Sequence, residues 1–417
     1  MENNKYNLAV IGGGPAGMMA AGHAAELGSR VILVEKNQRL GKKLLISGKG
    51  RCNITNAYGE LDKIVDLFGE NGKFLYSAFT KFSNRDVVDF FEFRGLKTKV
   101  ERGGRIFPVS DKAADVADCL RKYLKKNKVE VRFNSPVEKV IIKTQGNSRK
   151  KIERIILKNG DEITADNFLF ATGGKSYPGT GSTGDAYLWL KQMGHTVVMP
   201  KPVLTPVIVK EKIVKQLEGL SLKNVELSLW SKRKIDAFFG EALFTGNGLS
   251  GPQGLNLSKK ISESGAKDLK IKIDFKPALD YTVLDKRIQK DFSGQNNKQF
   301  KNSLDKLLPK KLIPVIIELS GINENKKVNE ITKIERNKLL HLLKEFELGV
   351  AGLAGFEKAI VTSGGVDLKE VDPRTMRSKI IDNLYFAGEI LDIDGPTGGY
   401  NLQVAWSTGY LVGENSL

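Results

Sequence analysis

The sequence predicts an α/β fold in which a doubly wound domain with a parallel sheet is interrupted by an inserted domain. Three observations lead to this prediction. A strand–glycine–helix unit opens the chain at Leu8, and a similar unit closes it after Leu384. Between the two, from about residue 195, the pattern changes to short strands and then to lysine-rich helices.

The first unit is a βαβ unit with a glycine-rich turn. The apolar strand 8–11 leads into Gly12, Gly13, Gly14, Pro15, Ala16 and Gly17, which open an alanine-rich helix to about Leu27. The strand 31–34 then ends in Glu35 and Lys36, with Glu35 18 residues after Gly17. We expect Gly12 to allow the turn, Gly14 to let backbone N–H groups approach a pyrophosphate, and Gly17 to let helix and strand pack closely. Glu35 would accept hydrogen bonds from the adenosine ribose, and its charge disfavours a 2′-phosphate.

The spacing G-x-G-x-x-G occurs twice more, at Gly179-Gly181-Gly184 and at Gly246-Gly248-Gly251. Neither copy stands between a strand and a second strand that ends in an acid, so both predict loops. The first of them directly follows the apolar stretch 167–174 and is expected near the ligand.

The C-terminal unit distinguishes FAD from NAD. FAD binds extended, so a second segment must hold its ribityl and isoalloxazine end. The strand 384–387 places Glu389 beside a ribityl hydroxyl or a phosphate-bound water. After the loop "DIDGPTGG", a helix from Tyr400 to about Val412 would aim backbone N–H groups at flavin N1 and O2, where negative charge gathers on reduction. We expect the two units to meet because their strands are neighbours in one sheet.

Longer motifs carry a family resemblance. They are "IGGGPAGMMAA", "GKKLLISGKGRCNITN", "GGRIFPVSDKAADV", "ATGGKSYPGTGSTGDAY", "GEALFTGNGLSGP", "TSGGV" and the C-terminal block. With them the chain resembles the FAD-dependent oxidoreductases that include aminoacetone-oxidase-like and 3-dehydro-bile-acid-reductase-like proteins. The resemblance implies a glutathione-reductase-like FAD domain with a barrel-like and a helical insertion. The expected parts are 1–194 and 349–417 for FAD, 195–279 for the β-rich insertion and 280–348 for the helical insertion.

The loop 41–56 is the best candidate for further contact with the cofactor. Ser47, Gly48 and Gly50 offer backbone N–H groups, Arg51 offers a bidentate donor and Asn53 can orient ring or ribityl atoms. Cys52 is expected to pack tightly near the flavin, because no C-x-x-C motif accompanies it. The remaining expected cofactor contacts are Lys43, Val137, Ala171, Thr172, Gly173, Gly388, Glu389, Gly399, Asn401 and Leu402. The pattern predicts no metal site and singles out no catalytic acid or base.

Local signals predict several boundaries. Ser83 is expected to cap a helix that ends before Gly95, and Ser110 a helix to about Lys126. Asn159-Gly160 predicts a hairpin turn.

Composition bounds the partners and the compartment. The chain has 417 residues, a net charge of +18 and two cysteines. Its basic clusters are scattered, which favours a solvated surface over a nucleic-acid partner. No apolar run is long enough to span a membrane, and the N-terminus does not resemble a signal peptide. With so few cysteines, these features predict a cytoplasmic protein without a membrane partner.

The sequence therefore predicts an FAD-dependent oxidoreductase with a small organic substrate in the cleft between the FAD and inserted domains. It acts either as an oxidase or as a reductase, and nicotinamide would bind only transiently because no second dinucleotide unit is evident. Two alternatives stay open: a flavin-dependent RNA-modifying enzyme, suggested by the charge, and a non-catalytic flavin-binding redox sensor.

Overall fold

The computed structural model describes residues 5–145 and 149–417. The chain divides into two units: one comprises the chain up to Pro202 together with Ile360–Leu417, and the other is Val203–Ala359. Sequence patterns placed these borders near residues 195 and 349. The difference arises where β11 (Val197–Val203) pairs with β18 (Val361–Val366), because this pairing ties both ends of the insertion to the first unit.

The first unit is built on a five-stranded parallel sheet in the order β19-β10-β1-β2-β6. Its strands are β1 (Tyr6–Ile11), β2 (Val31–Val34), β6 (Glu130–Arg132), β10 (Ala165–Phe170) and β19 (Leu384–Phe386). The predicted α/β class with a parallel sheet is confirmed. The two terminal units do share one sheet, but β10 lies between β1 and β19, so the expectation that their strands are neighbours was wrong.

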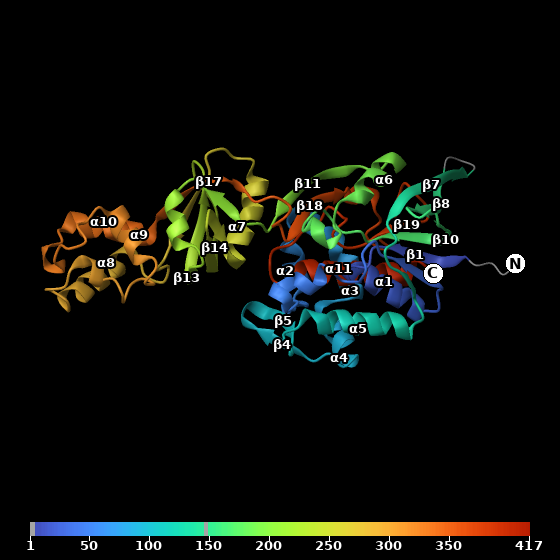
Figure 1. The fold of residues 1–417 in the computed structure, drawn as a ribbon, viewed down its shortest axis with the longest axis horizontal. Coiled ribbons are helices and arrows are strands. Elements are labelled where there is room, and N and C mark those ends of the chain that lie inside the picture. The colour runs from blue at the N-terminus through green and yellow to red at the C-terminus, as the bar shows by residue number, and fades with distance from the viewer. Residues whose placement is uncertain (1–4, 146–148) are drawn as a thin grey trace. The chain divides into compact units, whose positions relative to one another are not determined.

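Two helices from opposite ends of the chain pack against each other, α1 (Pro15–Glu26) and α11 (Tyr400–Asn415) (Figure 1). Glycines make this approach possible. A Cβ atom on Gly409 would lie 2.4 Å from the carbonyl oxygen of Ala16, and one on Gly413 would lie 2.9 Å from the Cβ of His23. Since real side chains do not approach so closely, these positions admit only glycine without a shift of one helix.

The rest of the first unit surrounds this centre. It contains helices α2 (Leu61–Asp66), α3 (Tyr76–Lys81), α4 (Asn84–Phe93), α5 (Ala113–Lys126) and α6 (Asp185–Met193), and strands β3 (Thr55–Asn56), β4 (Thr98–Glu101), β5 (Arg105–Pro108), β7 (Val137–Gln145), β8 (Arg149–Leu157) and β9 (Glu162–Ile163). Short 3₁₀ helices are η1 (Leu44–Gly50), η2 (Gly69–Leu75), η3 (Arg102–Gly104), η4 (Pro178–Thr180) and η8 (Leu368–Glu370).

Local predictions had mixed outcomes. Ser83 caps α4 and accepts from the backbone N–H of Asp86, as predicted. The turn at Asn159-Gly160 is also confirmed between β8 and β9. The cap at Ser110 was wrong, because α5 begins only at Ala113 with Lys112 in the capping position.

The second unit joins a closed barrel to helices. The barrel order is β12-β15-β14-β13-β16-β17, formed by β12 (Val207–Val209), β13 (Ser221–Trp230), β14 (Lys234–Thr245), β15 (Gly248–Ser250), β16 (Lys270–Asp274) and β17 (Phe346–Leu353). The helices are α7 (Gly251–Ser264), α8 (Tyr281–Ser293), α9 (Ile313–Ser320) and α10 (Lys333–Lys344), with η5 (Lys212–Leu217), η6 (Phe300–Asn302) and η7 (Val328–Glu330). One apolar core runs through barrel and helices.

Helix α7 was not predicted. Its opening, Gly251-Pro252-Gln253-Gly254, reads as a turn, although proline fits the first turn of a helix. Within the described ranges, no helix is both long enough and apolar enough to cross a membrane.

Candidate cofactor site

A deep cavity opens in the first unit where four parallel strands end. The residues at these ends line it: Ile11 ends β1, Val34 ends β2, Ala171 follows β10 and Ala387 follows β19. It encloses about 1390 Å³ of empty space, counting the part open to solvent. The carboxyl ends of the strands are where open α/β sheets bind their ligands.

Most of the predicted cofactor contacts line this cavity. They are Gly12, Gly13, Gly14, Pro15, Ala16, Glu35, Lys36, Lys43, Ser47, Val137, Ala171, Thr172, Gly173, Gly388, Glu389, Asn401 and Leu402. The fold thus gathers residues from both ends of the chain around one space. The described lining does not include Gly17, Gly48, Gly50, Arg51, Cys52, Asn53 or Gly399.

The N-terminus of α1 faces the cavity with its backbone donors exposed to a ligand. Gly14 occupies the capping position with φ −78°, and a Cβ atom there would meet no described atom within 4 Å. Pro15 follows, and the first turn carries no acid. Such a terminus attracts an anion. Gly17 serves packing, as predicted, because its Cβ would lie only 1.9 Å from the Gly12 carbonyl oxygen.

Glu35 is held in place by backbone donors. Its carboxylate is buried and accepts the N–H of Gly13 at 2.8 Å and the N–H of Asn37 at 2.8 Å. The Glu35 carboxylate is therefore fixed beside the glycine turn.

The N-terminus of α11 faces the same cavity. Gly399 occupies the capping position with φ +100°, no described side chain caps the helix, the first turn carries no acid, and Leu402 lines the space. Asn401 braces the preceding loop, since its side chain accepts the N–H of Gly395 at 2.8 Å and donates to the Gly395 carbonyl at 2.9 Å. Gly399 itself packs against β3, where a Cβ atom would lie 2.5 Å from the Thr55 carbonyl oxygen.

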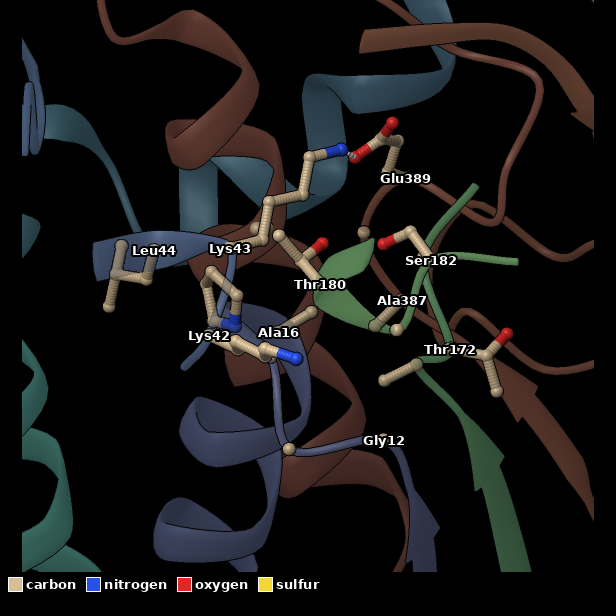
Figure 2. A pocket seen from close by; sticks show the side chains of 18 of the residues that line it. Gly12, Ala16, Lys42, Lys43, Leu44, Thr172, Thr180, Ser182, Ala387 and Glu389 are labelled. Atoms are coloured by element: carbon tan, nitrogen blue, oxygen red, sulfur yellow. Dashed lines mark hydrogen bonds and ion pairs between the residues drawn. The ribbon is translucent and has the colours of Figure 1, made fainter. Parts of the chain in front are cut away.

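An ion pair joins the segment after β2 to the segment after β19 at the wall of the cavity. Lys43 Nζ lies 2.6 Å from Glu389 Oε2, and Figure 2 shows the two side chains reaching toward each other. The other oxygen of Glu389 accepts the N–H of Thr362 at 2.9 Å. Glu389 therefore ties the residue before η1, strand β18 and the segment after β19 together at the cavity wall.

The distal part of the loop 41–56 turns away from the cavity. Arg51 pairs with Glu101 and, at 2.6 Å, with Asp111, and it stacks 4.1 Å from the Phe107 ring. Its guanidinium is thus engaged by the β4–β5 hairpin. Cys52 is fully buried, and this burial raises the pKa of its thiol to about 12, which agrees with a packing role.

A loop that the sequence signals only hinted at forms another wall. Thr180 and Ser182 line the cavity (Figure 2), and the loop is fastened to the end of β2. Lys36 Nζ donates to Thr183 at 2.5 Å and to Asp185 at 2.7 Å. This is the second glycine motif, Gly179-Gly181-Gly184, and its position after the apolar stretch 167–174 was the signal that placed it near the ligand.

The two helix termini fit an extended dinucleotide such as FAD. One uncapped glycine terminus can receive a diphosphate and the other the electron-rich end of the flavin ring. The Thr172 hydroxyl lines the cavity, is buried, and has no hydrogen-bond partner in the part of the chain that the structure describes, so it can bond to a ligand.

Comparisons with known proteins agree with this geometry. The HI0933-like protein Rossmann domain family matches residues 6–415, and the chain belongs to this family. A 3-dehydro-bile acid delta(4,6)-reductase of Clostridium scindens is 33% identical over 410 residues, which cover 97% of this chain and 98% of that protein. A ribosomal RNA dihydrouridine synthase of Haemophilus influenzae is 30% identical over 403 residues, 96% of each chain. The solved structure of a 3-ketosteroid delta1-dehydrogenase from Sterolibacterium denitrificans shares the fold, with a TM-score of 0.52, 13% identity and 99% of each chain covered.

Proposed function

We propose that this FAD-dependent oxidoreductase reduces a carbon–carbon double bond conjugated to a carbonyl in a small organic molecule, with NADH or NADPH as the transient electron donor. The observation that carries the proposal is the opening of two uncapped helix N-termini, one from each end of the chain, on a single cavity. The bound flavin supplies the hydride chemistry, and the protein supplies binding and charge.

The residues have separable tasks in this proposal. The α1 terminus at Gly14 binds the diphosphate, and Glu35 receives the adenosine ribose. The α11 terminus, next to Leu402, stabilises negative charge on the ring. Lys43 and Glu389 hold the cavity wall between the two ends.

The names of the relatives support reduction of a double bond. A 3-dehydro bile acid with double bonds at positions 4 and 6 is a conjugated ketone, and a dihydrouridine is a uridine whose C5–C6 double bond has been reduced. Both substrates accept a hydride at a carbon conjugated with a carbonyl, the β carbon in uridine and the β or δ carbon in the dienone, and a proton at the other carbon of the reduced double bond. The shared chemistry supports the reaction class across two unlike substrates.

Reduction of uridine in ribosomal RNA is the second candidate. The net charge of +18 favours it, since a polyanionic substrate gains from a basic surface. If RNA is the substrate, its binding should weaken steeply between low and physiological salt. A steroid enone would show little such dependence.

A single-turnover experiment tests both candidates. The purified protein is loaded with FAD, reduced anaerobically with NADH or NADPH, and mixed with a 3-oxo-4,6-diene steroid or with unmodified ribosomal RNA, while the flavin spectrum is followed. Reoxidation by the steroid, with a reduced steroid product, is the expected result. Reoxidation only by RNA, with dihydrouridine formed, would establish the second candidate. Reoxidation by neither would overturn both and leave the redox sensor.

The compartment belongs to the same proposal. Cys52 and Cys119 are both free and buried, which supports a reducing environment such as the cytoplasm. An active enzyme in a cytosolic fraction is the expected result.

A further inference from the structure

A buried chain of hydrogen bonds fixes the first turn of α11. Gln403 closes that turn, because its N–H donates to the Gly399 carbonyl at 3.0 Å. Its side-chain Oε1 accepts from the Thr55 hydroxyl at 2.5 Å, and its Nε2 donates to Ser407 Oγ at 2.8 Å and to the Phe82 carbonyl at 3.1 Å. The turn that faces the cavity is therefore clamped through its own closing residue.

This chain lies in the protein interior. Gln403 is 2% exposed, Thr55 is 1% and Ser407 is 0%. Ser407 also donates to the Phe82 carbonyl at 2.6 Å, and the neighbouring Trp406 donates its Nε1 to the Ile54 carbonyl at 3.0 Å. Buried polar groups that are all paired with one another favour a single arrangement. Any displacement leaves a donor or acceptor without its partner, in a place where water cannot replace that partner.

The hydrogen bonds of the Gln403 side chain, which we call the clamp, restrain α11 in a different direction from the glycine seam formed by Gly409 and Gly413. Gly409 and Gly413 set how closely α11 approaches α1. Contacts between such small residues do little to stop one helix from shifting along its own axis. The bonds to Thr55 and Phe82 resist such sliding. Thr55 also belongs to β3, whose Asn56 donates to the Gly398 carbonyl at 3.0 Å, so one strand fixes both the helix and the loop before it.

We propose that the Thr55–Gln403–Ser407 chain sets the position of the α11 N-terminus against the flavin ring and thereby sets the redox potential of the bound cofactor. The inference rests on the proposed function, in which this terminus stabilises charge on the reduced ring. Gln403 is a positioning residue, since it acts through the backbone N–H groups of the turn. A shift of the terminus weakens binding of reduced FAD more than binding of oxidised FAD, because only the reduced ring gains the negative charge.

The test compares the redox potential with the stability of variants. Gln403→Met keeps the volume but leaves the Thr55 hydroxyl unpaired, whereas Gln403→Met combined with Thr55→Val removes both members of that bond. In either variant the Phe82 carbonyl can keep its hydrogen bond from Ser407. The double variant should melt close to the wild type, because removing both members of a buried hydrogen bond costs little. We expect its preference for reduced over oxidised FAD to fall about tenfold, which is about 30 mV more negative for a two-electron couple. Anaerobic titration against a reference dye measures the potential, and flavin fluorescence measures affinity.

Two controls separate positioning from general damage. Thr55→Ser retains the hydroxyl and should keep the wild-type potential. Asn383→Leu removes another buried amide of the first unit, which bonds to Ile152 and Asp166 near the opposite ends of the strands. It should lower stability and leave the potential unchanged.

The outcomes distinguish this inference from the proposed function. A folded double variant with an unchanged potential would overturn the inference while FAD binding by the wild type stands. Failure of the wild type to bind FAD would overturn the proposed function itself. If the double variant does not fold, Ser407→Ala replaces it, with a smaller shift in the same direction expected and no shift overturning the inference.

Discussion

In the proposed function the two helix termini at the cavity, those of α1 and α11, share one electrostatic task, and the fold positions them by different means. At α1 the glycine turn, the helix and the acid Glu35 lie within 24 consecutive residues, from Gly12 to Glu35. At α11 the terminus depends on partners distant in sequence, since Gln403 bonds to Thr55 and to the Phe82 carbonyl. The proposed phosphate end is thus encoded locally, whereas the proposed flavin end is positioned by tertiary structure.

The N-termini of α1 and α11 therefore differ in how they tolerate a substitution of their capping glycine. Gly14 borders open space, so its surroundings leave room for a ligand. Gly399 combines φ +100° with a close approach to the Thr55 carbonyl, so its surroundings leave no room at all. A substitution at the α1 terminus can therefore change ligand binding without changing stability, whereas a substitution at the α11 terminus changes both.

Substitution of a glycine at the contact between α1 and α11 should have the largest effect on stability and on FAD binding. Gly409→Val places a branched side chain against the Ala16 carbonyl oxygen, 2.4 Å from the new Cβ atom. Because two backbones would have to separate, we expect a loss of about 3 kcal/mol and a melting temperature lower by about 5–10 °C, together with loss of FAD binding. Thermal unfolding followed by circular dichroism measures the loss. Gly355→Ala, whose Cβ would meet no described atom within 4 Å, is the control and should melt like the wild type.

The same contrast explains what the sequence could predict. The α1 end was predicted residue by residue, because strand, turn, helix and acid are contiguous and each has a local signal. The α11 helix was predicted as well, and Asn401 both lines the cavity and braces its own loop, but the hydrogen bonds of the Gln403 side chain were missed. A buried glutamine in a helix has no distinctive spacing, and only the fold reveals its partners.

The loop 41–56 shows the same limit. Its proximal residues Lys43 and Ser47 line the cavity. Arg51 was expected to contact the cofactor, yet the acids Glu101 and Asp111 hold its guanidinium. The sequence identifies Arg51 as a hydrogen-bond donor but leaves open whether it meets the cofactor or an acid of another segment. Only the fold shows that Glu101 and Asp111 lie beside it.

A matched pair of alanine substitutions sharpens the comparison between the two ends. Gly14→Ala should change stability by less than about 1 kcal/mol, because φ is already negative and the space is open, but it should weaken FAD binding about tenfold by occupying the approach to the phosphates. Gly399→Ala should lower both stability and affinity, because strain and overlap act together. Fluorescence titration of FAD alongside thermal unfolding measures both. Parallel losses of stability in the two variants would contradict the distinction.

The smallest expected effect concerns pH at the far end of the α1–α11 pair. His23 of α1 is buried and stacks on Tyr410 of α11, with ring centroids 3.9 Å apart. Burial lowers the pKa of His23 below 6.5, although Glu26 nearby acts in the opposite direction. The unfolded chain therefore takes up a proton that the folded protein resists, so stability is lost as the pH falls through about 6.5 and below.

His23→Phe keeps a ring against Tyr410 and removes this titration. We expect the free energy of unfolding to fall less steeply for the variant than for the wild type between pH 7 and pH 5, by at most the slope of one proton, about 1.4 kcal/mol per pH unit. Urea unfolding at several pH values measures the slope. An equal slope in both proteins would mean that Glu26 offsets the burial of His23 and would contradict the prediction.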